Sequence, residues 1–230
     1  MRRHVLIIDN NHVSPCKHCM AFRPRKFTRA TVVRPTEEEL PANLDTYTHI
    51  ILTGGSPASS MDDAVVYQRI QKLVRKAYRA GVPMLGICLG HELIITSLLS
   101  LQDFKRHDQE EIGWVEIQRH GPSRLFEGLP SRFVSFANHS GHIKRLPHGF
   151  RVIGSSKRCS IEAYEHETKP VFGMQFHPEK TPRQTLRTVW RRVKQDMPDS
   201  FFIHPYSARR LYRARVKYTL FRNFYAQKRT

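Results

Sequence analysis

The sequence predicts an α/β fold in which a mostly parallel central sheet is flanked by helices. Short apolar runs of strand length alternate along the chain with segments whose apolar residues recur at helical spacing. With 230 residues and a hydrophobic content of 40%, the chain can bury the core of one large domain. We expect this domain to span residues 1–196 and a basic, helical C-terminal extension to span residues 197–230.

The first half of the chain is predicted to supply three buried strands and two helices. The segment Ala64–Ala80 has apolar residues near helical spacing, and Gly81 after it is a stop signal. A second helix-like segment, Leu89–Leu101, follows the third strand after a tight turn. The predicted strands are Val5–Ile8, Ile50–Thr53 and Met84–Ile87.

The second half is richer in strands and then becomes helical. Thr181 and Pro182 favour the start of a helix, because proline is well tolerated in the first turn. The apolar residues of that helix share one face, namely Leu186, Val189, Trp190 and Val193. The strands predicted before it are Val115–Gln118, Arg132–Ala137, Val152–Ser155, Ile161–Tyr164 and Val171–Gln175.

The turn after Met84–Ile87 carries a cysteine, Cys88, between Gly86 and Gly90. The two glycines allow a sharp turn and a close approach of neighbouring backbone. A cysteine at a helix N-terminus lies near the positive end of the peptide dipoles, which favours the nucleophilic thiolate. A base and a group that orients it are also needed, and His177 and Glu179 have the right side chains. Alone, however, such a cysteine is more often a small buried hydrophobe, and His-Pro-Glu is more often a loop.

Taken together and in this order, the two motifs resemble the class I glutamine amidotransferase family, over about residues 4–195. The nucleophile turn of that family reads Gly-x-Cys-x-Gly and its distal motif reads His-Pro-Glu. The resemblance implies a triad of Cys88, His177 and Glu179 that cleaves the side-chain amide of glutamine through a γ-glutamyl thioester. It also implies an oxyanion hole made by the backbone N–H groups of Gly55 and Leu89. No cofactor and no metal are expected.

Departures from the family pattern leave the nitrogen acceptor open. The candidate substrate-binding residues are Gly54, Glu92, Asn138 and His139. Glu92 replaces the usual glutamine and Ser56 replaces a proline, as in γ-glutamyl hydrolases of the same superfamily. Residues 125–179 instead resemble amidotransferase subunits of the guanylate synthetase type. We therefore expect an amidotransferase that passes ammonia to a separate synthetase partner. The alternatives are a stand-alone γ-glutamyl hydrolase and an inactive binding module.

The positive charge of the chain is concentrated near its C-terminus. Residues 180–230 contain 14 lysines and arginines but only two acidic residues, a net charge of +12 of the total +18. Residues 207–225 could form a basic amphipathic helix. Such a helix could pack on its own domain, or residues 201–230 could bind an acidic protein surface or RNA. Interleaved aromatic and charged residues disfavour the membrane surface, and no apolar run reaches the length of a membrane span.

Four cysteines in a chain of this length do not suggest a disulfide scaffold. A reactive thiol fits a reducing compartment, so a cytoplasmic location is expected. Cys16 and Cys19, with two histidines nearby, could hold zinc, but one Cys-x-x-Cys pair favours a free-thiol loop. Cys159 belongs to no motif and is predicted to be a core thiol.

Overall fold

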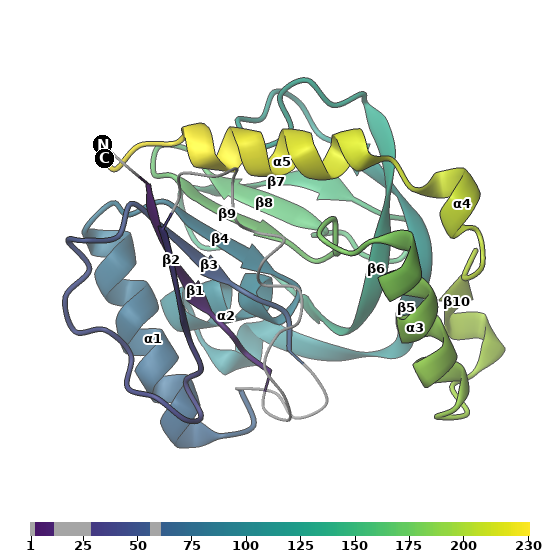
Figure 1. The fold of residues 1–230 in the computed structure, drawn as a ribbon, viewed down its shortest axis with the longest axis horizontal. Helices are drawn as coiled ribbons and strands as arrows, with labels where there is room; N and C mark the ends of the chain where they lie inside the picture. Colours follow the sequence, from purple (N-terminus) through teal and green to yellow (C-terminus); the bar gives the residue numbers. More distant parts are fainter. Residues whose placement is uncertain (1–2, 12–28, 56–60) are drawn as a thin grey trace.

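The computed structural model describes residues 3–11, 29–55 and 61–230, and within them one mixed sheet carries helices on both faces (Figure 1). The strands run in the order β10-β5-β7-β8-β9-β4-β3-β1-β2, and β6 pairs with β5. The strands are β1 (His4–Ile8), β2 (Arg29–Val33), β3 (His49–Leu52), β4 (Met84–Ile87), β5 (Phe104–Arg119), β6 (Arg132–Ile143), β7 (Phe150–Ser155), β8 (Ala163–His166), β9 (Val171–Met174) and β10 (Phe202–Ile203). The α-helices are α1 (Ala64–Arg79), α2 (Leu89–Leu98), α3 (Pro182–Val193), α4 (Ala208–Leu211) and α5 (Ala214–Ala226).

The predicted α/β fold with a central sheet and flanking helices is confirmed, but the sheet is mixed rather than mostly parallel. β2, β1, β3, β4 and β9 are parallel neighbours, whereas β9-β8-β7-β5-β6 pair antiparallel. The reason lies in the connections: only residues 167–170 join β8 to β9. Parallel neighbours need a crossover of a dozen or more residues, so β8 and β9 can pair only as a hairpin.

Most predicted elements exist, with changes at their ends. The strand at residues 84–87 is confirmed, and the first helix ends one residue earlier than predicted. The helix expected over Leu89–Leu101 stops at Leu98, and Ser100 then caps a short 3-10 turn by accepting a hydrogen bond from the Gln102 N–H at 3.1 Å. The strand expected at residues 161–164 lies at residues 163–166.

The two faces of the sheet are covered by different helices. Along β1, Val5 and Ile7 belong to one apolar cluster and Leu6 and Ile8 to the other, as the two-residue period of a strand requires. Helices α1 and α2 cover the face of Leu6 and Ile8. Helix α5 covers the opposite face and lies across the sheet (Figure 1). Both faces of the central strands are therefore buried.

Helix α5 packs on the domain, which is the first of the three arrangements considered for the basic segment. Its buried residues Val216, Leu220, Phe221, Phe224 and Tyr225 join the same cluster as β1, β4 and β9. The Asn223 side-chain amide also donates to the carbonyl oxygens of Leu125 and Glu127, at 2.9 and 2.8 Å. Arg215 and Arg222 stay exposed. In the described part of the chain, no helix is both long and apolar enough to cross a membrane.

Replacing Phe224 with alanine is expected to lower the free energy of unfolding by about 3–5 kcal/mol, because it opens a cavity between α5 and the sheet. Urea unfolding followed by circular dichroism measures this change. Tyr218→Ala on the same helix is the matched control, since Tyr218 is 69% exposed and should cost little. Equal effects of the two substitutions would show that α5 does not seal the core.

Candidate active site

Cys88 lies on a sharp turn between β4 and α2. Its φ is +51° and its ψ is −113°, a conformation that is costly for a residue with a side chain. The surrounding backbone enforces it. A Cβ on Gly86 would clash with the carbonyl oxygen of Gly90, and one on Gly90 would clash with that of Leu52. The Cys88 N–H also donates to the Met174 carbonyl oxygen at 2.7 Å, so the turn is fixed to β9.

His177 and Glu179 follow β9, the parallel neighbour of β4. Because parallel strands end at the same edge of a sheet, this pairing brings the His-Pro-Glu motif to the end of β4 that carries Cys88. Nδ1 of His177 lies 2.7 Å from Oε1 of Glu179. A Cβ on Gly54 would lie 2.9 Å from His177 Cε1 and 3.4 Å from Cys88 Cβ, so the imidazole and the cysteine flank the same glycine. Nε2 of His177 is buried, with no hydrogen-bond partner in the described chain.

Burial sets the protonation states of these three groups. It raises the pKa of the Cys88 thiol, and nearby Glu92 raises it further, while Lys180 and the Leu89 N–H act more weakly in the opposite direction. The expected thiolate at the helix N-terminus is therefore not the resting form, because burial outweighs the peptide dipoles. Burial, followed by Lys180, lowers the pKa of His177 and favours the neutral imidazole.

Glu179 remains a carboxylate despite its burial. Burial alone would raise its pKa, but His177 and Lys180 outweigh that effect and leave the pKa below its usual value. The resting site therefore combines a thiol, a neutral imidazole with a free Nε2 and a carboxylate that accepts from Nδ1–H. This arrangement suits general-base activation of the thiol by His177.

A cavity of about 550 Å³ opens beside Cys88. Gly55 and Leu89 both line it, and a Cβ on Gly55 would lie 2.5 Å from Leu89 Cδ2 and 2.6 Å from the Asn10 carbonyl oxygen. The two positions expected to supply oxyanion-hole donors thus lie together next to the nucleophile. Ser56, which follows them, is outside the described residues. The cavity is lined by Gly55, Met61, Asp62, Cys88, Leu89, Glu92, Leu101, Phe104, Glu110, Asn138, His139, Ser140, Gly141, Arg192 and Gln195.

Three of the four candidate substrate-binding residues, Glu92, Asn138 and His139, line this cavity; the fourth, Gly54, instead lies against His177 and Cys88. Asn138 Oδ1 is buried and lacks a hydrogen-bond partner among the described residues, so it is available to a ligand. The Asn138 carbonyl oxygen lies 3.8 Å from Cys88 Sγ and can accept from the thiol.

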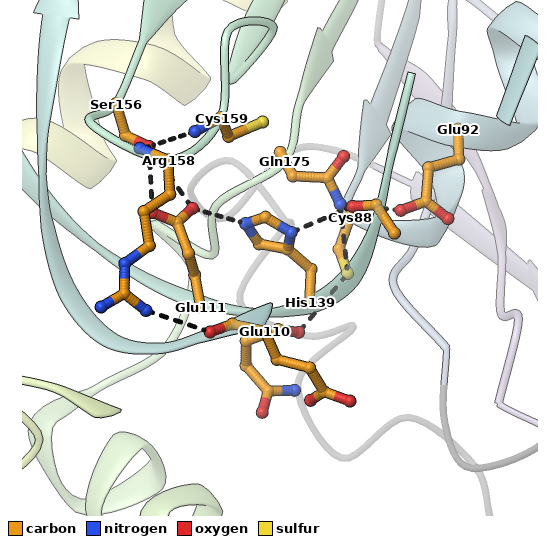
Figure 2. Close-up of polar contacts among 11 residues, drawn as sticks. Cys88, Glu92, Glu110, Glu111, His139, Ser156, Arg158, Cys159 and Gln175 are labelled. Carbon is orange, nitrogen blue, oxygen red and sulfur yellow. Dashed lines mark hydrogen bonds and ion pairs between the residues drawn. The ribbon is translucent and has the colours of Figure 1, made fainter. Parts of the chain in front are cut away.

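Sequence reasoning missed several residues of this cavity. Gln175, which ends the predicted strand Val171–Gln175, was given no role in the site. Its side-chain amide donates to Glu92 Oε1 at 2.8 Å and lies 4.0 Å from Cys88 Sγ (Figure 2). Arg192 reaches the cavity from α3 and pairs with Glu110 of β5. The sequence of α3 shows helical spacing only for its apolar residues, so no local pattern pointed to Arg192.

Of the three cysteines other than Cys88, Cys159 is the one within the described residues. Cys159 is a buried free thiol, as predicted. Cys16 and Cys19 lie outside the described residues. Within those residues, Glu111, His139 and Glu162 form the one group with side chains of the types that bind metals, but His139 Nε2 already bonds to Glu111 Oε2 at 3.0 Å. We treat this group as a hydrogen-bonded cluster, and the expectation that no metal is needed stays a prediction.

Comparison with known proteins agrees with this geometry. The sequence pattern described as glutamine amidotransferase class-I matches residues 6–193. The chain belongs to the class I glutamine amidotransferase family. The resemblance stated from the motifs is thus confirmed, and the chain is an enzyme of that class.

Among curated amidotransferase relatives, the chain is 34% identical over 142 residues to the glutamine-hydrolyzing GMP synthase subunit of Methanocaldococcus jannaschii, covering 62% of this chain and 69% of the relative. It is 40% identical to the Thermococcus kodakarensis protein of the same name, covering 48% of this chain and 58% of that protein. The fold matches a glutamine amidotransferase crystal structure from Thermotoga maritima with a TM-score of 0.80 and 20% identity, covering 98% of this chain and 97% of the other. That coverage includes α5, so the amidotransferase fold extends into the basic segment.

The amidotransferase also buries His91, which lies on α2 just after the nucleophile turn and packs against the ring of Tyr164. Burial, aided by the positive His139, lowers the pKa of His91 to about 3. In the unfolded chain the same group titrates near pH 6.5. Between these two values the unfolded state binds a proton that the folded state does not, so acid favours unfolding.

We therefore expect the free energy of unfolding to fall as the pH drops below 6.5, with His91 contributing up to about 1.4 kcal/mol per pH unit until its folded pKa is reached. His91→Leu should make the decline shallower, whereas replacing exposed His148 with glutamine should not. Urea unfolding between pH 4 and 7 measures the slopes. Parallel curves for the wild type and His91→Leu would contradict the assignment.

Proposed function

We propose that the chain is the glutaminase component of a two-protein GMP synthase. It hydrolyses glutamine at Cys88 and passes the ammonia to a separate synthetase protein. The observation that carries the proposal is the meeting of the strained Cys88 turn with the His177–Glu179 pair at one cavity, in a family whose relatives at 34–40% identity are named as glutamine-hydrolyzing GMP synthase subunits. A cytoplasmic location goes with this proposal.

In the proposed reaction, Cys88 Sγ attacks the side-chain amide carbon of glutamine while its proton passes to His177 Nε2. The N–H groups of Gly55 and Leu89 stabilise the oxyanion that forms. His177 then gives its proton to the departing nitrogen, and ammonia leaves behind a γ-glutamyl thioester. Water attacks this thioester with His177 as the base, and glutamate and the Cys88 thiol are released. Glu179 orients the ring through Nδ1.

Because the pKa of the Cys88 thiol is raised, much of the stabilisation of the transition state must come from the oxyanion hole. Because the resting thiol keeps its proton, attack requires proton transfer to a neutral imidazole in a buried site. The proton transfer and the charge on the oxyanion must therefore be stabilised together. Residues 56–60, which follow Gly55 in the sequence, lie outside the described residues.

One observation favours the hydrolase alternative. Glu92, which stands where amidotransferases commonly have glutamine and resembles the hydrolases at this position, lines the cavity. A stand-alone γ-glutamyl hydrolase would use the same Cys88 chemistry with a larger amine as leaving group.

The role of the basic segment is also part of the proposal. We propose that the chain divides by function into a catalytic domain, residues 1–196, and a basic helical extension, residues 197–230. In it, the apolar side of α5 covers the sheet while exposed cations of the same helix, such as Arg215 and Arg222, face an acidic surface of the synthetase protein or RNA.

Cys88→Ala is expected to abolish glutamate release, because it removes the nucleophile. Coupled glutamate detection, with glutamine and a panel of γ-glutamyl conjugates, tests this with and without the synthetase protein. Cys159→Ala is the matched control, since that thiol is also buried but lies outside the cavity. Retained turnover in Cys88→Ala would overturn the mechanism. Conjugates turned over faster than glutamine without a partner would make the chain a hydrolase.

The pH dependence of kcat/KM should report the neutral imidazole. Because burial lowers the pKa of His177, the active neutral form persists on acidification, and the acid limb should lie below pH 6.5. Glu179→Gln should move that limb to still lower pH, since the carboxylate raises the pKa of His177. Its kcat should also fall. An acid limb above pH 6.5 in the wild type would rule out this protonation state.

A further inference from the structure

Behind the glutamine cavity lies a buried charged cluster that the proposed reaction does not use. Glu111 comes from β5, His139 from β6 and Glu162 from the turn before β8. Ligand-type atoms of all three lie within 4.8 Å of one another. Figure 2 shows the His139 ring between Glu111 on one side and Cys88 and Glu92 on the other. The cluster therefore connects the cavity wall with the interior of the domain.

Hydrogen bonds fix the state of the His139 ring. Nδ1 lies 3.0 Å from the Gly141 carbonyl oxygen, so it must carry a proton and donate. Nε2 lies 3.0 Å from Glu111 Oε2, whose other oxygen accepts from the Ser156 hydroxyl at 3.0 Å. Burial would lower the pKa of His139, but Glu111 and Glu162 outweigh it and raise the pKa to about 9. The pair is therefore an imidazolium bonded to a carboxylate.

Glu162 completes the cluster as an uncharged acid. Its side chain is fully buried, and its carboxyl group lies beside the Glu111 carboxylate, to which it can donate a hydrogen bond when it keeps its proton. Two carboxylates beside one imidazolium would leave a net negative charge in the interior, which is costly. Burial raises the pKa of Glu162 to about 8, in accord with a retained proton.

The main-chain ladder is interrupted where this pair sits. The register of β5 on β6 shifts between Arg106 and Glu111, and Glu111–His139 is the first pair after the shift. Asn138, His139 and Gly141 of β6 keep their partners Ile112, Glu111 and Arg106, so the irregularity lies between His139 and Gly141, opposite the extra residues 107–110 of β5. The side-chain bond between Glu111 and His139 crosses the two strands at the edge of this irregularity and adds a restraint to the main-chain pairing there.

The segment 138–141 is the cavity wall that contacts the nucleophile. The Asn138 carbonyl oxygen accepts from the Cys88 thiol, and a Cβ on Gly141 would lie 3.2 Å from Glu92 Oε1. A shift of this segment would therefore move both the acceptor of the thiol proton and the neighbour of Glu92. The other titratable groups around His139 are Glu92 and His91 of α2, and His177.

We propose that the Glu111–His139 ion pair positions the cavity wall at residues 138–141 against the Cys88 thiol, and that Glu162 supports the pair as a neutral carboxylic acid. Glu111 and Glu162 are positioning residues that act through His139. Only the effect on glutamine turnover rests on the proposed function. The reactivity of the Cys88 thiol toward an alkylating reagent can be measured whether or not the chain hydrolyses glutamine.

The test compares two isosteric changes in one cluster. Glu111→Gln removes the charge that His139 needs and is expected to lower kcat for glutamine about 10- to 100-fold, with a smaller change in KM. Glu162→Gln replaces a neutral acid by a neutral amide and should stay within about threefold of the wild type. The second readout is the rate of Cys88 alkylation by iodoacetamide, followed by peptide mass spectrometry, which should change in Glu111→Gln but not in Glu162→Gln.

Ser156→Ala is the alternative test variant if the Glu111→Gln protein does not fold. It removes the hydroxyl that donates to Glu111 Oε1, so the Cys88 alkylation rate should change in the same direction to a smaller degree. Wild-type alkylation rates in both Glu111→Gln and Ser156→Ala would overturn the inference. So would equal damage from Glu111→Gln and Glu162→Gln, or stoichiometric zinc or manganese that is lost in Glu162→Gln. A wild-type chain without glutaminase activity would count against the proposed function only, because the alkylation comparison still decides this inference.

Discussion

The rest of the site depends on one steric constraint, the close approach of α2 to the ends of β3 and β4. Gly86 faces the Gly90 carbonyl and Gly90 faces the Leu52 carbonyl, with no room for a side chain at either glycine. That contact forces Cys88 into its positive φ. The pairing of β4 with β9 then brings His177 to the same edge. Sheet register and two glycines bring Cys88 and His177 to one edge of the sheet, where side-chain contacts such as His177–Glu179 then orient them.

Burial is the dominant electrostatic influence on this geometry. It makes Cys88 a thiol and His177 a neutral base, and it makes every uncompensated charge in the interior costly. The domain responds by pairing its buried carboxylates. Glu179 is bonded to His177, Glu111 to His139, and Glu165 to Arg151 and Ser123. The same low polarity strengthens the donors that meet an oxyanion beside Cys88.

Features encoded by neighbouring residues could be predicted from the sequence, whereas features set by pairing could not. Cys88 with its glycines, the His-Pro-Glu motif and the strand at residues 84–87 are local patterns, and each was found. The polar, charged start of the 16-residue β5 hid most of that strand, and the short β2 was not recognised. The mixed sheet follows from connection lengths that strand prediction did not weigh. Glu111 and His139 are 28 residues apart, so their bond follows only from the register of β5 on β6.

The position of α5 in the core affects how the protein is made. A ribosome delivers the strands of the sheet, through β9 at residue 174, well before residues 214–226. At ordinary elongation rates that interval is roughly 2–8 seconds. During it, the face later covered by Phe221 and Phe224 presents Val5, Ile7 and Phe172 to water. The nascent chain thus carries an exposed apolar sheet face that only its own late helix can close, and chaperones have those seconds in which to protect it.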